Sequence, residues 1–551
     1  MSDISPFNQF VAKFYNCDYD LLNDNTILLK CAKQTAINLN IGNINDSFFL
    51  YNPGGTTVIV TLSNGELYLN TDTKNKITYI NLFTHKKVLN LDTTFKYTSD
   101  NLKASNYECI EYRKVHSEDN NLSISNFKKS LTSNSIVLSI LGSCGGVAKS
   151  VLSILNKAYT DVKDPIHKYI SSCKLHLIDK KQKNIKYYSG HFPNIIDNIV
   201  LHEFDVNSCK TFKKHLKETC SNIVIDISFA DTVNTLKCCD DLGVIYINSA
   251  FESIEVDNNP KIAGFSLQER YKIFEKNRCN FKNTLAIICS GMNPGVVQWM
   301  AIDLMKKYPD KKPKACYIVE DDTSFFEDKK LINKDTIYTT WYPEGFLDEA
   351  IYSYPTFMKK HSSLFLYKEV YELEFKVSLG EKIFYGCLMP HEEAITLGKM
   401  YDMEVGFIYK INDHTSNIIK DNLNNLDSLW DRKMQVLDPE INPLTGEDTI
   451  GIILVFDDKE AYVYNSLNNY ETFKKYGTNA TYLQVASGIY GALSTVLLDN
   501  LPIGIYYVDE LLNCTDSKYG EYLSYHLEEF TFGENKTTDG TLLDRMREIK
   551  K

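Results

Sequence analysis

The chain has 551 residues, 43% of them hydrophobic and 12% aromatic, so it can bury large cores and is expected to divide into about two to four domains. Its net charge of −11 argues against nucleic acid as the main partner, because proteins that bind phosphate backbones concentrate Lys and Arg. No apolar run in the sequence approaches the roughly 20 residues that cross a bilayer, so we expect no membrane partner.

The cysteines and the N-terminus indicate the compartment. The 14 cysteines are scattered without a C-x-x-C spacing, which favours reduced thiols in the cytoplasm over disulfides or zinc. Residues 1–6 lack the basic and apolar segments of a signal peptide. We therefore expect a cytoplasmic protein without a metal site.

Residues 1–130 predict a β-rich N-terminal extension. An Asn-Gly dipeptide at 64–65 separates the apolar runs Thr57–Leu62 and Glu66–Leu69, and this dipeptide tolerates the positive φ angles of a two-residue hairpin turn. A further strand is expected at Ile77–Leu82. The sequence assigns no role to this extension.

A β-branched run at 135–141 ends at glycines and continues into a helical pattern, which predicts a strand, a tight turn and a helix N-terminus. Such a turn lets the backbone approach a pyrophosphate, and the first helical N–H groups supply hydrogen-bond donors. The match to G-x-G-x-x-G is imperfect, because Ile140 stands where the first glycine is expected. The predicted cofactor contacts on this turn are Gly142, Ser143, Cys144 and Gly145.

Short apolar strands alternate with helical stretches over residues 131–292, and such runs are typical of strands buried on both faces of a parallel sheet. The predicted strands are 135–141, 174–178, 199–204, 222–227, 244–248 and 284–289. This alternation predicts a Rossmann-type, doubly wound α/β domain that binds NAD. Asp179 ends the second strand, where a carboxylate accepts hydrogen bonds from ribose hydroxyls and favours NAD, although Lys180 and Lys181 leave NADP open.

The remaining sequence predicts an inserted domain and a return. Residues 293–465 mix strands and helices, and we expect an α+β substrate and dimerisation domain there. Residues 466–551 are expected to pack back on the Rossmann domain, beginning with the helix entry at Asn479. The apolar piece at Ala486–Leu498 is interrupted by Ser and Thr and is expected to be a buried helix.

Several short motifs follow one another in a specific order. They are the glycine turn, Tyr246–Glu252, Gly291–Gly295, Glu320–Thr323, Thr340–Glu349, His391–Ile395, Asn479–Val485 and Val508–Glu510. Through them the chain resembles homospermidine synthase, within the saccharopine dehydrogenase-like group. The resemblance implies a homodimer that joins two putrescines, or putrescine and another diamine, and releases ammonia. It also implies that NAD takes a hydride early and returns it later.

The resemblance places the chemistry on four residues. A hydride leaves the carbon beside an amine only when the amine is neutral, so a base must hold its proton, and His391 and Glu393 are the candidates. Their alternative role is a helix N-terminus with favourable acidic residues. Trp341 resembles the family's channel tryptophan, whose face attracts a protonated amine by roughly 0.5–2 kcal/mol. The alternative role of Trp341 is that of a buried core residue. Glu349 completes the predicted catalytic set.

Putrescine is a dication, and each ammonium removed from water needs an opposite charge or several acceptors. Glu320 and Glu252 are the carboxylates expected to bind it. The other site residues implied by the resemblance are Asn293, toward substrate and cofactor, Asp231, toward substrate, and Ser228, toward cofactor.

Two alternatives remain open. One is an NAD(P)-dependent reductase that forms saccharopine or a carboxylated polyamine; it would need Arg or Lys for the substrate carboxylate, whereas the motifs offer Glu, Asp and Trp. The other is a non-catalytic NAD-binding scaffold. The family's run after the tryptophan motif is replaced by Ala350–Pro355, which leaves the identity of the diamine open.

Overall fold

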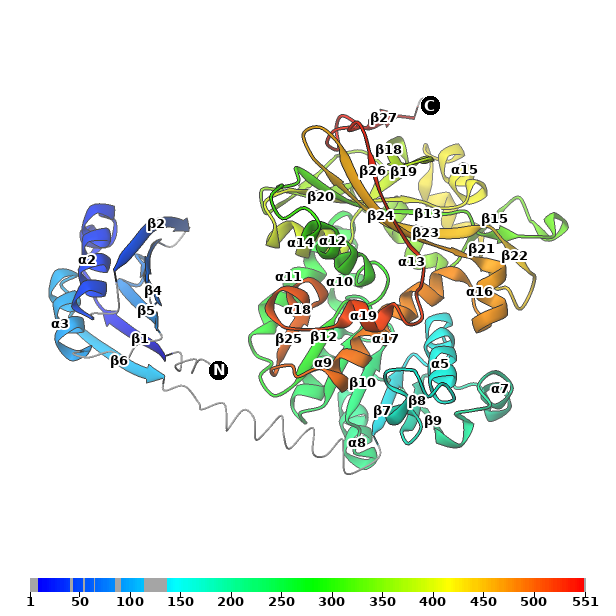
Figure 1. Cartoon of the computed structure of the whole chain (residues 1–551), viewed down its shortest axis with the longest axis horizontal. Helices are drawn as coiled ribbons and strands as arrows, with labels where there is room; N and C mark the ends of the chain where they lie inside the picture. Colours follow the sequence, from blue (N-terminus) through cyan, green and yellow to red (C-terminus); the bar gives the residue numbers. More distant parts are fainter. Residues whose placement is uncertain are drawn as a thin grey trace. The chain divides into compact units, whose positions relative to one another are not determined.

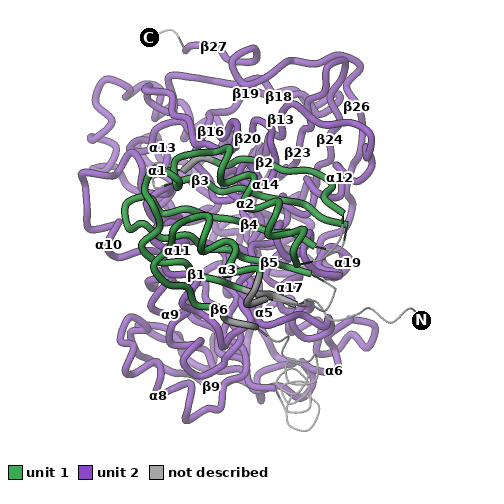
Figure 2. Tube along the Cα trace, turned by 90° about the vertical axis from the view of Figure 1, so that its left-hand side faces the viewer, with its two compact units in different colours: residues 1–130 green, residues 131–551 purple. Residues whose placement is uncertain are grey.

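The computed structural model describes residues 8–39, 43–52, 55–63, 65–84, 91–112 and 136–549. The chain forms two compact units, Met1–Ser130 and Leu131–Lys551, coloured green and purple in Figure 2. Each unit has its own sheets and its own hydrophobic core.

Unit 1 is a six-stranded antiparallel sheet with helices on one face (Figure 1). The strand order is β2-β3-β4-β5-β1-β6. Its elements are β1 (Asn8–Tyr15), α1 (Tyr19–Leu22), α2 (Asn25–Asn38), β2 (Ile44–Asn52), β3 (Gly55–Leu62), β4 (Gly65–Asp72), β5 (Ile77–Thr84), α3 (Leu91–Asn101) and β6 (Asn106–Tyr112). Alternate residues of β3 and β5 are buried, because one face of the sheet packs on α2 and the core beneath it.

The predicted hairpin of unit 1 forms, and its second strand begins one residue earlier than predicted. Leu62 of β3 pairs with Gly65 of β4, so Gly65 belongs to a strand, and Asn64 lies outside the described residues. The strand predicted at Ile77–Leu82 is confirmed as β5.

Unit 2 contains a seven-stranded parallel sheet in the order β25-β12-β11-β10-β7-β8-β9. Its strands are β7 (Val137–Leu141), β8 (Lys174–Asp179), β9 (Ile199–Glu203), β10 (Ile223–Asp226), β11 (Ile245–Asn248), β12 (Leu285–Ile288) and β25 (Gly504–Tyr507). The helices of this part are α5 (Gly146–Ala158), α6 (His167–Ile170), α7 (Ile185–His191), α8 (Cys209–Thr219), α9 (Thr232–Asp240), α10 (Ile254–Asp257), α11 (Ser266–Arg278) and α18 (Val508–Cys514). All six predicted strands are confirmed, and the chain order reverses between β7 and β10, the switch point where doubly wound sheets bind ligands.

Ile140 does not occupy the turn, because it lies inside β7. It pairs with Leu177 and Ile225 on the two neighbouring strands and is fully buried. The turn begins at Gly142, whose φ is +74°. The isoleucine at position 140, where the G-x-G-x-x-G pattern expects glycine, therefore does not alter the turn itself.

The second sheet of unit 2 has ten strands in the order β26-β24-β23-β13-β20-β19-β18-β27, with β16 and β17 beside β20. They are β13 (Ala315–Asp322), β16 (Thr356–Lys359), β17 (Ser362–Phe365), β18 (Leu373–Leu379), β19 (Lys382–Met389), β20 (Glu404–Lys410), β23 (Glu447–Val455), β24 (Glu460–Asn468), β26 (Phe530–Asn535) and β27 (Met546–Glu548). Two small sheets join β14 (Phe325–Phe326) to β22 (Leu444–Thr445) and β15 (Thr336–Thr339) to β21 (Lys433–Val436). Because β25 belongs to the parallel sheet and β26 and β27 belong to the ten-stranded sheet, residues 466–551 complete both large sheets rather than the Rossmann sheet alone.

The remaining helices of unit 2 pack on or beside the ten-stranded and small sheets, and α17 also reaches the parallel sheet (Figure 1). They are α12 (Val296–Lys306), α13 (Pro343–Ile351), α14 (Glu392–Met400), α15 (Asp413–Asp421), α16 (Asn469–Tyr476), α17 (Ala480–Leu498) and α19 (Tyr519–Leu523). Helix α17, capped by Asn479, contacts α5 and β11 on one side and β23 on the other. It is long and apolar enough to cross a membrane, yet 83% of its apolar window is buried inside the protein, which confirms the predicted buried helix.

Candidate active site

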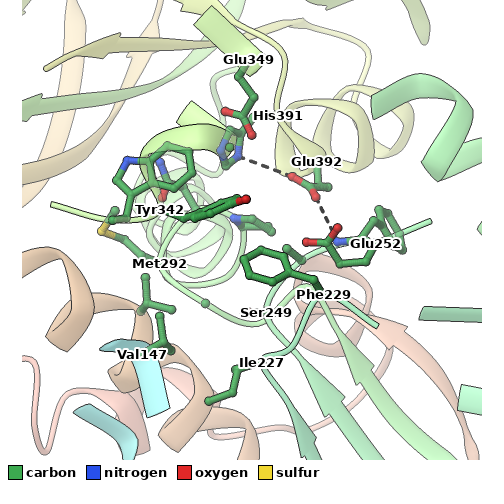
Figure 3. Close-up of a pocket in the computed structure, with 18 of the residues that line it drawn as sticks. Val147, Ile227, Phe229, Ser249, Glu252, Met292, Tyr342, Glu349, His391 and Glu392 are labelled. Atoms are coloured by element: carbon green, nitrogen blue, oxygen red, sulfur yellow. Dashed lines mark hydrogen bonds and ion pairs between the residues drawn. The ribbon is translucent and has the colours of Figure 1, made fainter. Parts of the chain in front are cut away.

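A cavity of about 880 Å³ lies in unit 2 at the carboxyl ends of the Rossmann strands (Figure 3). Four loops of that sheet line it, one after each of β7, β10, β11 and β12. The opposite walls come from α13, the β19–α14 connection and β20. The cavity therefore occupies the crevice in which doubly wound sheets hold their ligands.

The glycine turn opens toward this cavity. A Cβ on Gly142 would lie 2.5 Å from the Ile227 carbonyl oxygen, so glycine is needed there for space as well as for its positive φ. Gly145 is the N-cap of α5, and residues 145–148 line the cavity. The ring of Tyr482 packs directly on Gly146, and both residues line the cavity.

The other predicted cofactor residues shape this turn or flank it. The Cys144 N–H donates to Asp179 Oδ2 at 2.9 Å, and Ser143 Oγ accepts a hydrogen bond from Gln182 at 2.9 Å. Ser228 lines the cavity. The N–H groups of residues 142–145 are hydrogen-bonded within the protein, so the donors left for a pyrophosphate are those of the first turn of α5, at the cavity residues 146–148. This helix N-terminus and the adjacent cavity fit a nicotinamide dinucleotide.

Ser228 is held by a buried carboxyl group at the end of β10. Its Oγ donates to Asp226 Oδ1 at 2.7 Å, and Tyr246 donates to Asp226 Oδ2 at 2.9 Å. Burial raises the pKa of Asp226 to about 6. These hydrogen bonds fix the start of the loop that follows β10, which is the loop that carries Ser228.

Trp341 lies on the cavity wall just before α13. Its Nε1 is 3.4 Å from the Tyr409 hydroxyl, and its ring meets Phe346 edge-on at 6.1 Å between centroids. Because the side chain is held at its edges and lines the cavity, its indole is placed to meet a ligand.

His391 and Glu393 form a hydrogen-bonded pair of which His391 lines the cavity. His391 Nδ1 is 2.6 Å from Glu393 Oε2, and Glu393 is fully buried. Its second oxygen, Oε1, has no hydrogen-bond partner among the described residues. Burial by itself lowers the pKa of His391, but the charges of Glu393 and Glu392 outweigh burial and raise that pKa to about 10. The pair therefore holds a proton on the imidazole.

Glu392 is a cavity residue that the sequence analysis did not single out. It lies 3.8 Å from His391 Nδ1, and its Oε1 accepts the N–H of Phe251 at 3.2 Å; Figure 3 shows it beside Glu252. Glu392 lies within the His391–Ile395 motif, so the sequence contained a signal for it. His391 is the N-cap of α14, and the two glutamates are the first residues of that helix. The motif alone does not tell which of them faces the ligand.

Three predicted carboxyl groups line the same cavity with strongly perturbed pKa values. Burial raises the pKa of Glu349 to about 7, against the opposing charge of His391. Burial raises the pKa of Glu252 to about 8, against the charge of Arg270. Burial and the charge of Asp322 raise the pKa of Glu320 to about 8. Carboxyl groups that titrate near neutral pH can exchange protons with an amine at working pH.

Asn293 and Asp231 have different surroundings. Asn293 lines the cavity, and its Nδ2 donates to Glu320 Oε2 at 2.7 Å. Asp231 caps α9, accepting the N–H of Asn234 at 3.0 Å and that of Ile254 at 3.3 Å. The described residues that line the cavity do not include Asp231, so its carboxylate holds backbone at the cavity's edge.

The cavity wall contains an arginine, Arg270, that the sequence analysis did not predict. The motifs offered no Arg or Lys for the pocket, yet Arg270 of α11 lines the cavity and donates to Asp257 at 2.7 Å. Arg270 lies outside every motif, so its position depends on how α11 packs. The acidic cavity therefore contains a guanidinium.

His391, Glu392 and Glu393 also form a cluster that could hold a metal ion. Their ligand atoms lie within 4.8 Å of one another. The hydrogen bond between His391 Nδ1 and Glu393 Oε2 already uses one candidate ligand atom of each residue, so a metal ion would have to displace that bond.

The sheet order and the cavity at its switch point define unit 2 as a Rossmann-type α/β fold with a ligand crevice. The model of the S-adenosylmethionine decarboxylase family matches residues 8–114, which lie in unit 1. The adenosylmethionine decarboxylase of Aquifex aeolicus is similar at 12% identity and a TM-score of 0.17, over 20% of this chain and 89% of that one.

Two oxidoreductase structures are also similar. The saccharopine dehydrogenase (L-Glu forming) of Saccharomyces cerevisiae matches at 11% identity and a TM-score of 0.44, over 73% of this chain and all of that one (100%). A leucoanthocyanidin reductase–NADPH complex from Vitis vinifera matches at 13% identity and a TM-score of 0.20, over 28% of this chain and 49% of that one. No curated protein sequence matches the chain. The fold class rests on the sheet order itself.

Proposed function

We propose that the chain is a homospermidine synthase, an aminobutyl transferase that joins putrescine to a second putrescine or another diamine and releases ammonia. The observation that carries this proposal is that Trp341 and Glu349 of one motif and His391 of another line one acidic cavity that reaches the glycine turn. When bound, NAD would supply the acceptor and later the donor of the hydride.

The cavity residues are suited to hold a diamine. The ammonium groups of putrescine would lie against Glu320 and Glu252, and their charge would return the raised pKa values of these carboxyl groups toward the normal range. Asn293 fixes the orientation of Glu320 through its 2.7 Å hydrogen bond. Trp341 offers an indole face to the cationic intermediate between the two ends.

Proton transfer falls to Glu349 and His391, which lie beside each other in Figure 3. Glu349, with a pKa of about 7, is placed to take the proton of the amine before oxidation. His391, with a pKa of about 10, is protonated at neutral pH and can give a proton to the departing ammonia. Glu393 acts through His391 as a positioning residue, which differs from its predicted role as the base.

The test is to incubate the purified full-length chain with putrescine and NAD⁺ at about one hundredth of the putrescine concentration. Because the cofactor is regenerated, we expect triamine and ammonia in equal amounts, far exceeding the NAD⁺ supplied. Accumulation of NADH without triamine would instead identify a dehydrogenase. Omission of NAD⁺ is the matched control.

Arg270 favours a second candidate, an NAD(P)-dependent reductase that forms saccharopine or a carboxylated polyamine. A guanidinium in the cavity wall can bind a substrate carboxylate. The matching assay supplies an amine, a keto acid or aldehyde, and NADH or NADPH. Stoichiometric oxidation of the reduced cofactor, with no triamine from putrescine, would favour this reductase.

The oligomeric state is part of the proposal. On the same resemblance we propose a cytoplasmic homodimer of the 63.2 kDa chain. Light scattering on the purified chain tests it, and a monomer mass at micromolar concentration would contradict the dimer.

A further inference from the structure

Two aromatic rings face each other inside the cavity, one from each half of unit 2. Phe229 lies in the loop between β10 and α9, and Tyr342 is the N-cap of α13. Their ring centroids are 4.7 Å apart with an interplanar angle of 46°. Figure 3 shows the pair between Val147 and Ile227 on the cofactor side and the acidic residues on the other.

The exposure of both rings sets them apart from ordinary core residues. Phe229 is 64% exposed and Tyr342 is 43% exposed, and both line the cavity. Core rings are mostly buried, whereas a large part of each of these two rings is exposed to the cavity. The contact spans the cavity between the Rossmann sheet and α13.

The position of Tyr342 is fixed by its own helix. A Cβ on Gly345 would lie 2.8 Å from Tyr342 Cδ1, so the glycine leaves room for the ring against the first turn of α13. Burial and the negative charges of Glu344 and Glu252 raise the pKa of Tyr342. The phenol therefore stays neutral at the edge of an acidic region and presents an apolar face to Phe229.

The proposed reaction has a weakness that such a pair can address. Oxidation of putrescine by NAD⁺ leaves an iminium, R–CH=NH₂⁺. If a second amine adds to its carbon, ammonia leaves and a new C–N bond remains. If water adds instead, the C–N bond breaks, ammonium leaves and an aldehyde forms. Water is in large excess, so coupling depends on excluding it from that carbon.

We propose that Phe229 and Tyr342 form a gate that keeps water away from the iminium and so decides between coupling and hydrolysis. This inference rests on the proposed function, because it requires the iminium. The rings act by covering the reacting carbon, and neither ring exchanges a proton with it.

The experiment measures product partition in the full-length chain. Phe229→Ala, Tyr342→Ala and the double variant are supplied with putrescine and NAD⁺, and aldehyde and triamine are quantified together. We expect the aldehyde-to-triamine ratio to rise at least about fivefold in each single variant and further in the double variant. NADH should accumulate in step with the aldehyde, because each hydrolysed iminium leaves one hydride unreturned.

Two controls make the result specific. Tyr342→Phe keeps the ring and should keep the wild-type ratio. Tyr470→Ala removes an aromatic side chain of similar exposure, 62%, at the start of α16 away from the cavity, and should also keep the wild-type ratio. Because the two alanine variants lie on different elements, a folding defect in one, seen as a lowered Tm, leaves the other as the test.

The outcomes separate the two proposals. Triamine formation with an unchanged ratio in both alanine variants would overturn the gate and leave the proposed function standing. A wild-type chain that yields no triamine from putrescine would overturn the proposed function, and the gate with it.

Discussion

His391 and Glu393 share a hydrogen bond of 2.6 Å between Nδ1 and Oε2, and of the two His391 lines the cavity. A buried carboxylate behind an imidazole fixes the ring's tautomer and keeps it protonated. The proton would therefore be delivered by His391, and the ability of His391 to hold it depends on Glu393.

Replacing Glu393 with Gln should lower the pKa of His391, because the largest opposing effect is burial, which favours the neutral ring. If protonated His391 is the active form, the alkaline limb of the kcat–pH profile should move down by at least about one pH unit. Glu392→Gln is the matched control. Glu392 Oε2 lies 3.8 Å from His391 Nδ1, so this variant should shift the alkaline limb less. Equal shifts in the two variants would contradict the positioning role of Glu393.

Unfolding at different pH values reports on the buried carboxyl groups. Glu320 and Glu252 have folded-state pKa values of about 8, above the ordinary glutamate value of 4.5 that applies when unfolded. They bind more protons folded than unfolded, so their stabilisation is complete below about pH 4.5 and is lost as the pH rises through about 8. We expect Tm of the ligand-free chain to fall between pH 6 and 9.

Putrescine should reverse this loss by supplying positive charge, so its stabilising effect on Tm should grow with pH over the same range. Glu320→Gln should flatten the dependence, whereas Glu521→Gln, at a carboxylate 72% exposed, should not. A Tm that rises from pH 6 to 9 in wild type would contradict the assigned pKa directions.

Trp341 distinguishes an enzyme from an NAD-binding scaffold. Trp341→Ala should lower kcat/KM for putrescine by about 2- to 30-fold or more, the range of a cation–π contact, while Trp341→Phe should lose less. NADH binding, followed by its fluorescence, should be retained in both variants because the glycine turn is untouched. Unchanged turnover in Trp341→Ala would favour the scaffold.

The glycine turn gives a paired test of the cofactor site. Gly142→Ala places a methyl group 2.5 Å from the Ile227 oxygen at a φ of +74°, so it should distort the turn and weaken NAD affinity by at least about tenfold. Gly190→Ala in α7 is the control, because nothing described lies within 4 Å of its added Cβ. Calorimetric titration with NAD⁺ measures both, and equal affinities would exclude this turn as the pyrophosphate site.

The sequence predicted those features that depend on local pattern. The continuous apolar runs predicted all six Rossmann strands up to β12. A strand that is buried on both faces is apolar throughout, and this pattern can be recognised without knowing which strands lie beside it. Strand β25 was not predicted, because its four residues, Gly504–Tyr507, are too few to show a clear apolar run. Arg270 and Phe229 escaped because their place in the cavity depends on which elements pack together, and Glu392 because one helical step separates it from Glu393.

Unit 1 offers the last prediction. The described residues that line the cavity all fall within 145–485, and the two units have separate cores. A chain of residues 131–551 should therefore keep NAD affinity and, if unit 1 is not needed for assembly, form triamine at the wild-type rate. Calorimetry with NAD⁺, light scattering and the triamine assay are applied to both chains. Loss of NAD binding in the shortened chain, at wild-type mass and Tm, would show that unit 1 contributes to the cofactor site; loss of the dimer alone would assign unit 1 to assembly.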